Sequence, residues 1–133
     1  MKQEVGKVIL RVVLGLTFLL HGLVKFQGGL SNTAAWFDMI GLPGFLAYIV
    51  AVVEVIGGIA LILGLGTKIV SVLMAILLVG AIFTAKLQGG FLGDGAGAGY
   101  ELDLALFAMA VYLILADTSK FSLDAKFSSA ESN

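Results

Sequence analysis

A single carboxylate, Glu54, lies in the middle of a long apolar stretch, residues 45–65, whose only other polar side chain is the phenol of Tyr48. An apolar stretch of about 20 residues has the length of a transmembrane helix. Placing a carboxylate at the centre of such a helix costs roughly 2.5–3.5 kcal/mol. Glu54 therefore needs a partner cation, a bound proton or a water-filled cavity, and it is the first candidate for chemistry in this chain.

The first apolar stretch of the chain carries three basic side chains, Arg11, His21 and Lys25. On an ideal helix Arg11 and Lys25 fall within an arc of about 80°, and His21 lies roughly 40° beyond Lys25. Gly15 and Gly22 share this arc and would let another helix approach closely. The strongly polar groups of this stretch therefore point to one side, toward a packed neighbour.

Depth in the membrane decides which of these groups could meet. With a rise of about 1.5 Å per residue, Glu54 lies near the midplane, Lys25 lies near the outer boundary, and Arg11 lies about 10 Å inward. Arg11 could extend to the cytoplasmic surface or pair with Glu54, and His21 could reach Glu54 from the other side. We therefore expect Glu54 and His21 as catalytic candidates, with Arg11 and Lys25 as binding residues.

The last apolar stretch contributes two further candidates for binding. Glu101, Ala105, Ala108 and Tyr112 share one face of an ideal helix, and Asp103 points nearly the opposite way. We expect Glu101 and Tyr112 to face the site and Asp103 to be solvated. Glu101 also has a structural interpretation, because a carboxylate at the start of a helix suits the positive end of its dipole.

The basic side chains have structural interpretations as well. Arg11, Lys25 and Lys86 could anchor their helices at the membrane boundaries, with the charged groups extended toward water. His21 could be a hydrogen-bonded packing residue. Glu54 has no comparable interpretation, because its side chain is too short to reach water from the midplane.

The composition is that of a membrane protein. Of 133 residues, 59% are apolar and 13% are charged, and the mean hydropathy is +1.07, whereas a soluble domain is about half apolar and about a quarter charged. Continuous apolar runs favour membrane-spanning helices over barrel strands. The net charge is −1 and no basic patch suggests nucleic acid. The chain has no cysteine, so we expect no thiolate metal site, and any redox role needs a bound cofactor or a partner protein.

We predict one all-α membrane domain over residues 1–133, an integral four-helix bundle. Its spans are expected at residues 8–26, 45–65, 69–85 and 100–116, followed by a polar tail, residues 117–133, that lies on the membrane surface or is disordered. The first span is interpreted as uncleaved, because Arg11 interrupts it and no small-residue cleavage site follows. The short link at residues 66–68 makes the second and third spans an antiparallel hairpin.

The longer linkers differ in character. Residues 27–44 are expected to hold a short interfacial helix that Asn32 caps, with Trp36 at the membrane interface. Residues 89–99 are rich in glycine but lack the strand and the lysine of a phosphate loop, so we predict a flexible linker. Lysine and arginine concentrate on the side of the two termini, which places both termini in the cytoplasm.

Several motifs together form a pattern typical of one family. They are His21-Gly22-x-x-Lys25, with Arg11 upstream; Gly41-Leu42-Pro43; Val53-Glu54-Val55-Ile56-Gly57-Gly58; Glu101 at the start of the fourth span; and Ser122-Leu123-Asp124. From about residue 8 to residue 124 the chain resembles the DoxX family of small four-helix bacterial membrane proteins. The resemblance implies a multi-pass protein of the bacterial plasma membrane, an oxidoreductase component related to quinone or thiol stress, and at most a quinone as cofactor.

Two departures from the family pattern stand out. Asp117-Thr118-Ser119-Lys120 replaces a Gly-Pro-Gly that often precedes the final motif, and Lys86 stands where many members carry a histidine. Since His21 is the only histidine of the chain, a bis-histidine haem site is not expected.

Three functions fit these observations. The first is a redox-linked protein that binds a quinone-like molecule: His21 would hydrogen-bond a carbonyl or pass a proton, Glu54 would transfer a proton, and Lys25 and Glu101 would form the mouth. The second is transport of a small solute or of protons. The third is a non-catalytic subunit or an assembly or chaperone factor, in which an Arg11–Glu54 pair fixes the helix register. The bilayer, a redox partner protein and further copies of the chain are the expected partners.

Overall fold

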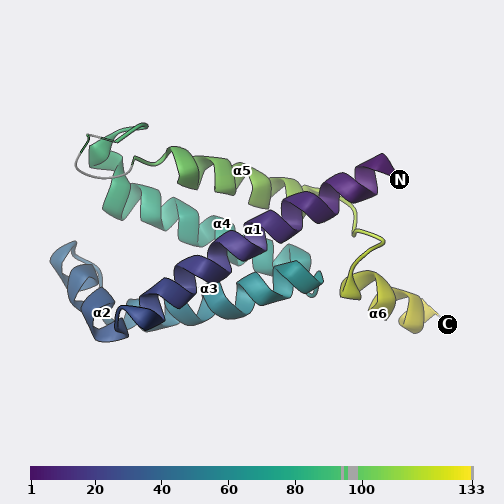
Figure 1. Cartoon of the computed structure of the whole chain (residues 1–133), viewed down its shortest axis with the longest axis horizontal. Coiled ribbons are helices and arrows are strands. Elements are labelled where there is room, and N and C mark those ends of the chain that lie inside the picture. Colours follow the sequence, from purple (N-terminus) through teal and green to yellow (C-terminus); the bar gives the residue numbers. More distant parts are fainter. Residues whose placement is uncertain (94, 96–98, 133) are drawn as a thin grey trace.

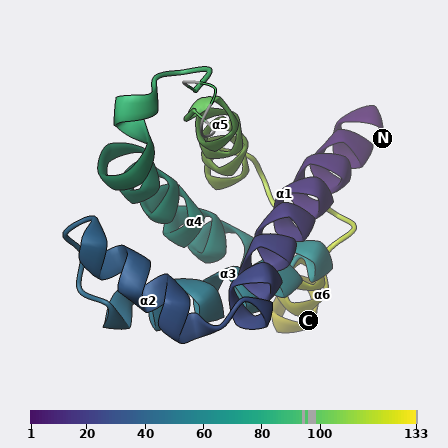
Figure 2. The same ribbon diagram turned by 60° about the vertical axis from the view of Figure 1, so that its left-hand side comes forward.

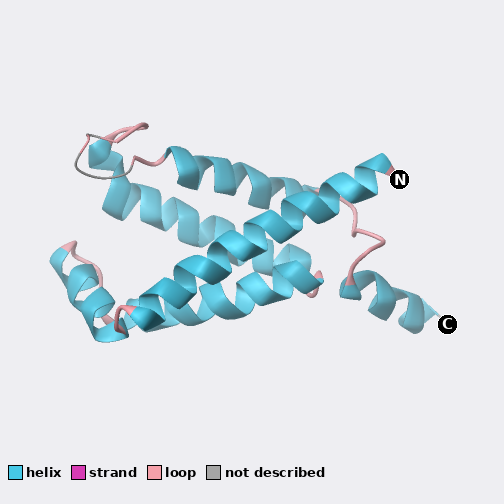
Figure 3. Ribbon diagram, in the orientation of Figure 1, coloured by secondary structure: helices cyan, strands magenta, loops and turns pink. Residues whose placement is uncertain are grey.

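The computed structural model describes residues 1–93, 95 and 99–132, and the regular elements of this part of the chain are helical (Figure 3). In chain order the α-helices are α1 (Lys2–Gln27), α2 (Leu30–Met39), α3 (Phe45–Leu63), α4 (Thr67–Ala81), α5 (Glu101–Leu115) and α6 (Leu123–Ser132). A π-helical turn, Ile82–Lys86, and a 3₁₀ turn, Leu87–Gly89, extend α4. The predicted all-α class is confirmed.

Among the described residues, three helical segments are long and apolar enough to cross a membrane: Lys2–Gln27, Phe45–Leu63 and Thr67–Gly89. The helix α5 is shorter, and its 15 residues extend over about 22 Å, less than the ~30 Å of bilayer hydrocarbon. It packs along α4 and also contacts α1, and so it completes the predicted four-helix bundle.

The bundle is built from two helix pairs (Figure 1). The helix α1 crosses α3, and α4 runs beside α5. The N-terminus, the α3–α4 turn and α6 lie at one end of the bundle, here called the terminal end, and α2 and the α4–α5 connection lie at the other, the α2 end (Figures 1 and 2). Both termini are therefore on one side, and the placement of that side in the cytoplasm stays a prediction.

Glycines set the crossing of α1 and α3. A Cβ atom on Gly58 would lie 2.6 Å from the carbonyl oxygen of Gly15 and 2.7 Å from the backbone nitrogen of Leu19. A Cβ on Gly15 would in turn lie 2.7 Å from the carbonyl oxygen of Gly58. Real side chains do not tolerate such distances, so the two backbones touch only because both positions lack a Cβ, as in small-residue packing between membrane helices.

The apolar core lies where the two helix pairs meet. It comprises Leu14, Phe18, Leu61, Met74, Ala75, Leu78, Leu106, Ala110 and Leu113. Gly57 of α3 faces the side chain of Met74 on α4, and a Cβ there would collide with the Met74 methyl group. The small face of α3 therefore receives α1 on one side and α4 on the other.

The predicted short helix between the first two spans is present as α2, but its start differs from the expectation. Gly29, with φ at +91°, precedes the first helical residue. Asn32 lies within the helix, and its side-chain amide donates to the carbonyl of Gly28 at 2.8 Å. Asn32 therefore satisfies the end of α1 and does not cap α2. Phe37 is buried, and α2 packs on α3.

The predicted polar tail is bonded to the terminal end of the bundle through residues 120–124 and continues as α6, and its position relative to the membrane surface stays a prediction. The Lys120 amide donates to Glu4 Oε2 at 2.8 Å, and the Asp124 amide donates to the carbonyl of Gly64 at 3.0 Å. The Asp124 carboxylate accepts the backbone N–H groups of Gly66 and Thr67 at 2.7 and 2.9 Å. It thereby caps the start of α4, whose own sequence offers no side-chain cap.

The α4–α5 connection is described only in part. The flexible linker expected over residues 89–99 includes residues 94 and 96–98, which lie outside the described residues. The two described flanks of the connection are hydrogen-bonded to each other. The amides of Tyr100 and Glu101 donate to the carbonyls of Gly90 and Phe91 at 3.2 and 3.0 Å. The Phe91 and Tyr100 rings meet edge to face at 5.6 Å.

Gly58→Ala is expected to weaken the bundle, because the added methyl group forces α1 and α3 apart. The free energy of unfolding in detergent should fall by about 1–3 kcal/mol. Gly80→Ala is the matched control: it lies within α4, where an added Cβ meets nothing within 4 Å, and it should leave stability unchanged or slightly raised. Equal stability of the two variants would contradict the close crossing.

Candidate functional site

The carboxylate of Glu54 forms an ion pair with Lys25 of α1. Glu54 is the tenth of the 19 residues of α3, and its Oε1 lies 2.7 Å from Lys25 Nζ. The Glu54 side chain is 7% exposed and that of Lys25 is 24% exposed. The compensation that Glu54 needs in the membrane is therefore a lysine ammonium that extends from near the end of α1.

The local sequence explains how the pair forms. Gly22 lies against α3 so closely that a Cβ there would be 3.1 Å from Glu54 Cβ and 2.7 Å from Val55 Cγ2. Lys25 follows one helical turn later on the same face, where its long side chain reaches back to the carboxylate. The spacing Gly22-x-x-Lys25 thus combines a point of close approach with the cation beside it.

His21 does not contact Glu54. Its Nδ1 lies 2.7 Å from the carbonyl oxygen of Thr17, and the residue is exposed on the outer face of α1. A carbonyl oxygen only accepts, so Nδ1 carries the hydrogen and Nε2 of the neutral ring is left as an acceptor. The side chains of His21 and Lys25 are one turn apart, but only Lys25 turns inward to α3.

Arg11 is not the partner of Glu54 either. It lies 14 residues before Lys25 on α1, about 21 Å along the helix axis. The Arg11 guanidinium is buried at the terminal end, where Nη2 donates to the carbonyl of Phe121 at 3.0 Å. The Arg11–Glu54 pair considered from the sequence is therefore replaced by two separate arrangements, one at each end of α1.

The helix α5 is turned about its own axis so that the face opposite to the predicted one packs in the bundle. Its buried positions are Asp103, Leu106, Ala110 and Leu113, so the face that carries Glu101 and Tyr112 points away from the bundle. Both of these side chains are exposed. The expectation that Asp103 is solvated is wrong. Asp103 shares one face of α5 with Leu106 and Leu113, and this face packs against α4, so Asp103 is buried as well.

A second ion pair, between Lys86 and Asp103, joins α4 to α5. Lys86 Nζ lies 2.7 Å from Asp103 Oδ2, with the two side chains 32% and 9% exposed. The Lys86 ammonium is the polar partner that the described residues give this buried oxygen. Lys86 is the last residue of the π-helical turn. Both residues stand out in the sequence, but their pairing depends on the inward register of α5, which the sequence did not predict.

These arrangements define what the α2 end can do chemically. The Lys25–Glu54 pair holds a proton donor and a proton acceptor within the bundle, and protonation of Glu54 would leave the ammonium without its partner. Among the described residues no three His, Asp or Glu side chains converge as they would around a metal ion. Proton exchange and binding of a polar group are therefore the chemistry that the described side chains offer.

Lys25→Met or Glu54→Gln alone is expected to destabilise the protein by up to about 3–5 kcal/mol, because each leaves the other group buried without its partner. The double variant should recover part of this loss, since both charges are then gone. Unfolding in mixed micelles measures the cycle. Losses that add to within about 0.5 kcal/mol would show that the two side chains are not coupled.

Comparison with known proteins identifies a matching family and several bacterial relatives of the chain. The family model described as DoxX matches residues 6–87. The chain is 43% identical over 121 residues to a Bacillus subtilis protein named "Putative oxidoreductase CatD", a match that covers 91% of this chain and 86% of that protein. It is 33% identical to a protein of Mycobacterium tuberculosis named "Uncharacterized membrane protein Rv3486", with 91% and 80% of the two chains covered.

A Haemophilus influenzae protein named as uncharacterized is 30% identical, with 89% of this chain and 87% of that one covered. No solved structure matches the chain. The DoxX model covers more than half of the sequence, including the Gly22-x-x-Lys25 spacing and the Glu54 motif that form the ion pair. This chain therefore belongs to the DoxX family of membrane proteins.

Proposed function

We propose that this chain is a redox-linked integral protein of the bacterial plasma membrane that binds a quinone-like molecule beside the Lys25–Glu54 pair. The observation that carries the proposal is the pair itself: the carboxylate lies in the middle of the apolar helix α3, and the ammonium of α1 lies 2.7 Å from it. Intramembrane ionisable groups typically mark ion pathways, proton relays or ligand sites. The word oxidoreductase in the name of the Bacillus subtilis relative is compatible with this choice.

In this proposal Glu54 is the proton-transferring group and Lys25 controls it. Reduction of a quinone to a quinol takes up electrons and protons in equal number, and the chain has no cysteine to carry electrons. Two electrons would come from a partner redox protein, and two protons from water would pass one at a time through Glu54, which is protonated only during transfer, to the two quinone oxygens. Lys25 would hold the carboxylate ionised between turnovers and would hydrogen-bond the reduced oxygen. His21, which is exposed on α1, would lie at the lipid side of the site.

Glu54→Gln is expected to weaken quinone binding by at least about tenfold, or ~1.4 kcal/mol, because the amide keeps the size of the side chain and loses its charge. Titration of the detergent-purified protein with a short-chain ubiquinone measures this affinity. Asp38→Asn is the control, the same chemical change at an exposed carboxylate on α2. Wild-type protein that retains no quinone after purification and binds none on titration would overturn the proposal.

A second candidate function, a non-catalytic subunit or assembly factor, is favoured by a different feature of the same residues. Both ion pairs bridge two helices, Lys25–Glu54 between α1 and α3 and Lys86–Asp103 between α4 and α5. A structural role alone can account for such pairs, because an ion pair between two helices fixes the register in which they pack.

A charge swap separates the two candidates. Lys25→Glu combined with Glu54→Lys should restore the stability lost in either single variant, because the ion pair is re-formed with reversed polarity. A purely structural role predicts that the swapped protein also keeps its activity in cells under quinone stress. A proton-transferring role predicts a stable protein that does not complement a deletion strain. Detergent melting curves and growth of the complemented strain are the two measurements.

A further inference from the structure

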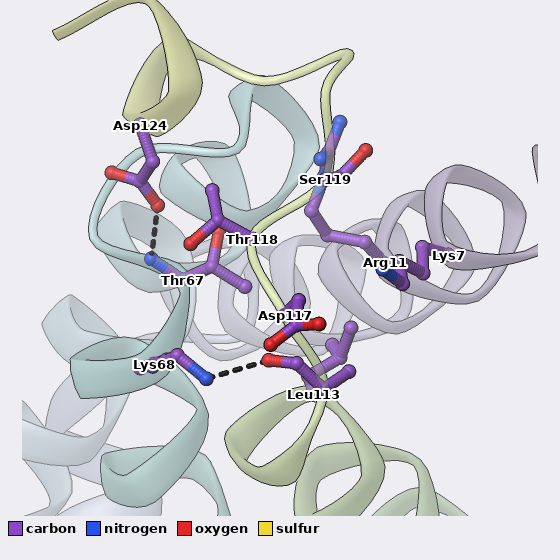
Figure 4. A pocket seen from close by; sticks show the side chains of 10 residues that line it. Lys7, Arg11, Thr67, Lys68, Leu113, Asp117, Thr118, Ser119 and Asp124 are labelled. Carbon is purple, nitrogen blue, oxygen red and sulfur yellow. Dashed lines mark hydrogen bonds between the residues drawn. The ribbon is translucent and has the colours of Figure 1, made fainter. Parts of the chain in front are cut away.

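A small polar cavity lies at the terminal end of the bundle, far from the Lys25–Glu54 pair. Side chains from α1, the start of α4, the end of α5 and the segment after it enclose the cavity (Figure 4). The charged groups that line it are Lys7, Arg11, Lys68, Asp117 and Asp124. Three cations thus face two carboxylates around one hollow, close to where the helices leave the membrane.

Arg11 is the part of this lining that lacks partners. The residue is 4% exposed, and only Nη2 has an acceptor, the carbonyl of Phe121. Its Nε and Nη1 atoms are buried and have no hydrogen-bond acceptor among the described residues. Gly64 makes room for the guanidinium, because a Cβ there would lie 2.9 Å from Arg11 Cζ and Nη1. Buried charged donors without acceptors are costly, so an acceptor from outside the chain is expected here.

The carboxylates around the cavity accept no hydrogen bond from Arg11, although the negative charge of Asp124 acts on the guanidinium. Both oxygens of Asp124 accept backbone N–H groups, from Gly66 and Thr67. In Figure 4 the Arg11 guanidinium points away from Asp117. The two lysines beside the cavity also have donors to spare. Lys68 donates to the carbonyls of Ile114 and Ala116, and Lys7 pairs with Glu4 at 3.3 Å. Since an ammonium has three N–H groups, each lysine keeps at least one for a ligand.

We propose that this cavity binds a phosphate oxyanion, with Arg11 as the main ligand and Lys7 and Lys68 beside it. The planar guanidinium fork matches the oxygens of a phosphate. Because Nε and Nη1 are buried, the Arg11 side chain would turn toward the cavity to place Nε and one further N–H on a bound phosphate. Basic pockets between membrane helices, at the level of the head groups, commonly hold lipid phosphates. The phosphate diester of an anionic lipid and free inorganic phosphate share this chemistry, and experiment distinguishes them.

Thermal unfolding of the wild-type protein in a neutral detergent tests the proposal directly. Phosphatidylglycerol should raise the melting midpoint, and phosphatidylcholine, whose choline adds a positive charge beside the phosphate, should raise it less. A rise with inorganic phosphate but not with phosphatidylglycerol would assign the site to the free anion. No rise with either would overturn the proposal and leave water as the occupant of the cavity.

Variants locate the effect. Arg11→Lys keeps one positive charge and loses the fork, and it should bind phosphatidylglycerol about tenfold more weakly, as measured by the lipid-bound fraction in native mass spectrometry. Lys2→Gln, at an exposed position on the same end of α1, should bind as the wild type does. Equal losses in both variants would mean a diffuse electrostatic attraction and would contradict a built site. If Arg11→Lys does not fold, the lipid and phosphate titrations of the wild type still decide the question.

Discussion

Gly15 and Gly58 bring the backbones of α1 and α3 into contact, and this contact decides what each polar side chain of α1 can reach. With no side chain between the helices, the two cannot slide past one another without collision. Lys25 is held at the depth of Glu54, and Arg11 is held at the far end, against the segment that follows α5. The polar residues of α1 therefore serve two separate environments, although they share one face of the helix.

The two helix pairs solve the same problem in similar ways. Each pair contains a carboxylate that is almost fully buried, and each neutralises it with a lysine from near the end of the partner helix. A lysine suits this task because its long stem can cross apolar surface and carry the ammonium to the buried carboxylate. In the α4–α5 pair the π-helical turn lies at the point where Lys86 must leave α4, in keeping with the frequent occurrence of such turns at functional sites.

Much of the bundle follows from the sequence because long apolar runs, glycine spacing and interrupting polar residues act locally. The inward face of Arg11, Gly15, Phe18 and Gly22 was predictable from helical period alone. The rotation of α5 was not, because that helix is apolar nearly all round and its orientation depends on contacts with α4. The partner of Glu54 was missed for a related reason: helix depths estimated from span boundaries placed Lys25 outside its reach.

The C-terminal motif acts on a part of the chain that is far away in sequence. The start of α4 has no cap of its own, and Asp124 supplies one from 57 residues downstream. During synthesis the α3–α4 hairpin can enter the membrane long before this carboxylate exists. Until then, water must satisfy the backbone donors at the start of α4. Closure of this end of the bundle thus depends on a segment made after the four bundle helices, and a chain without Asp124 would leave the start of α4 uncapped.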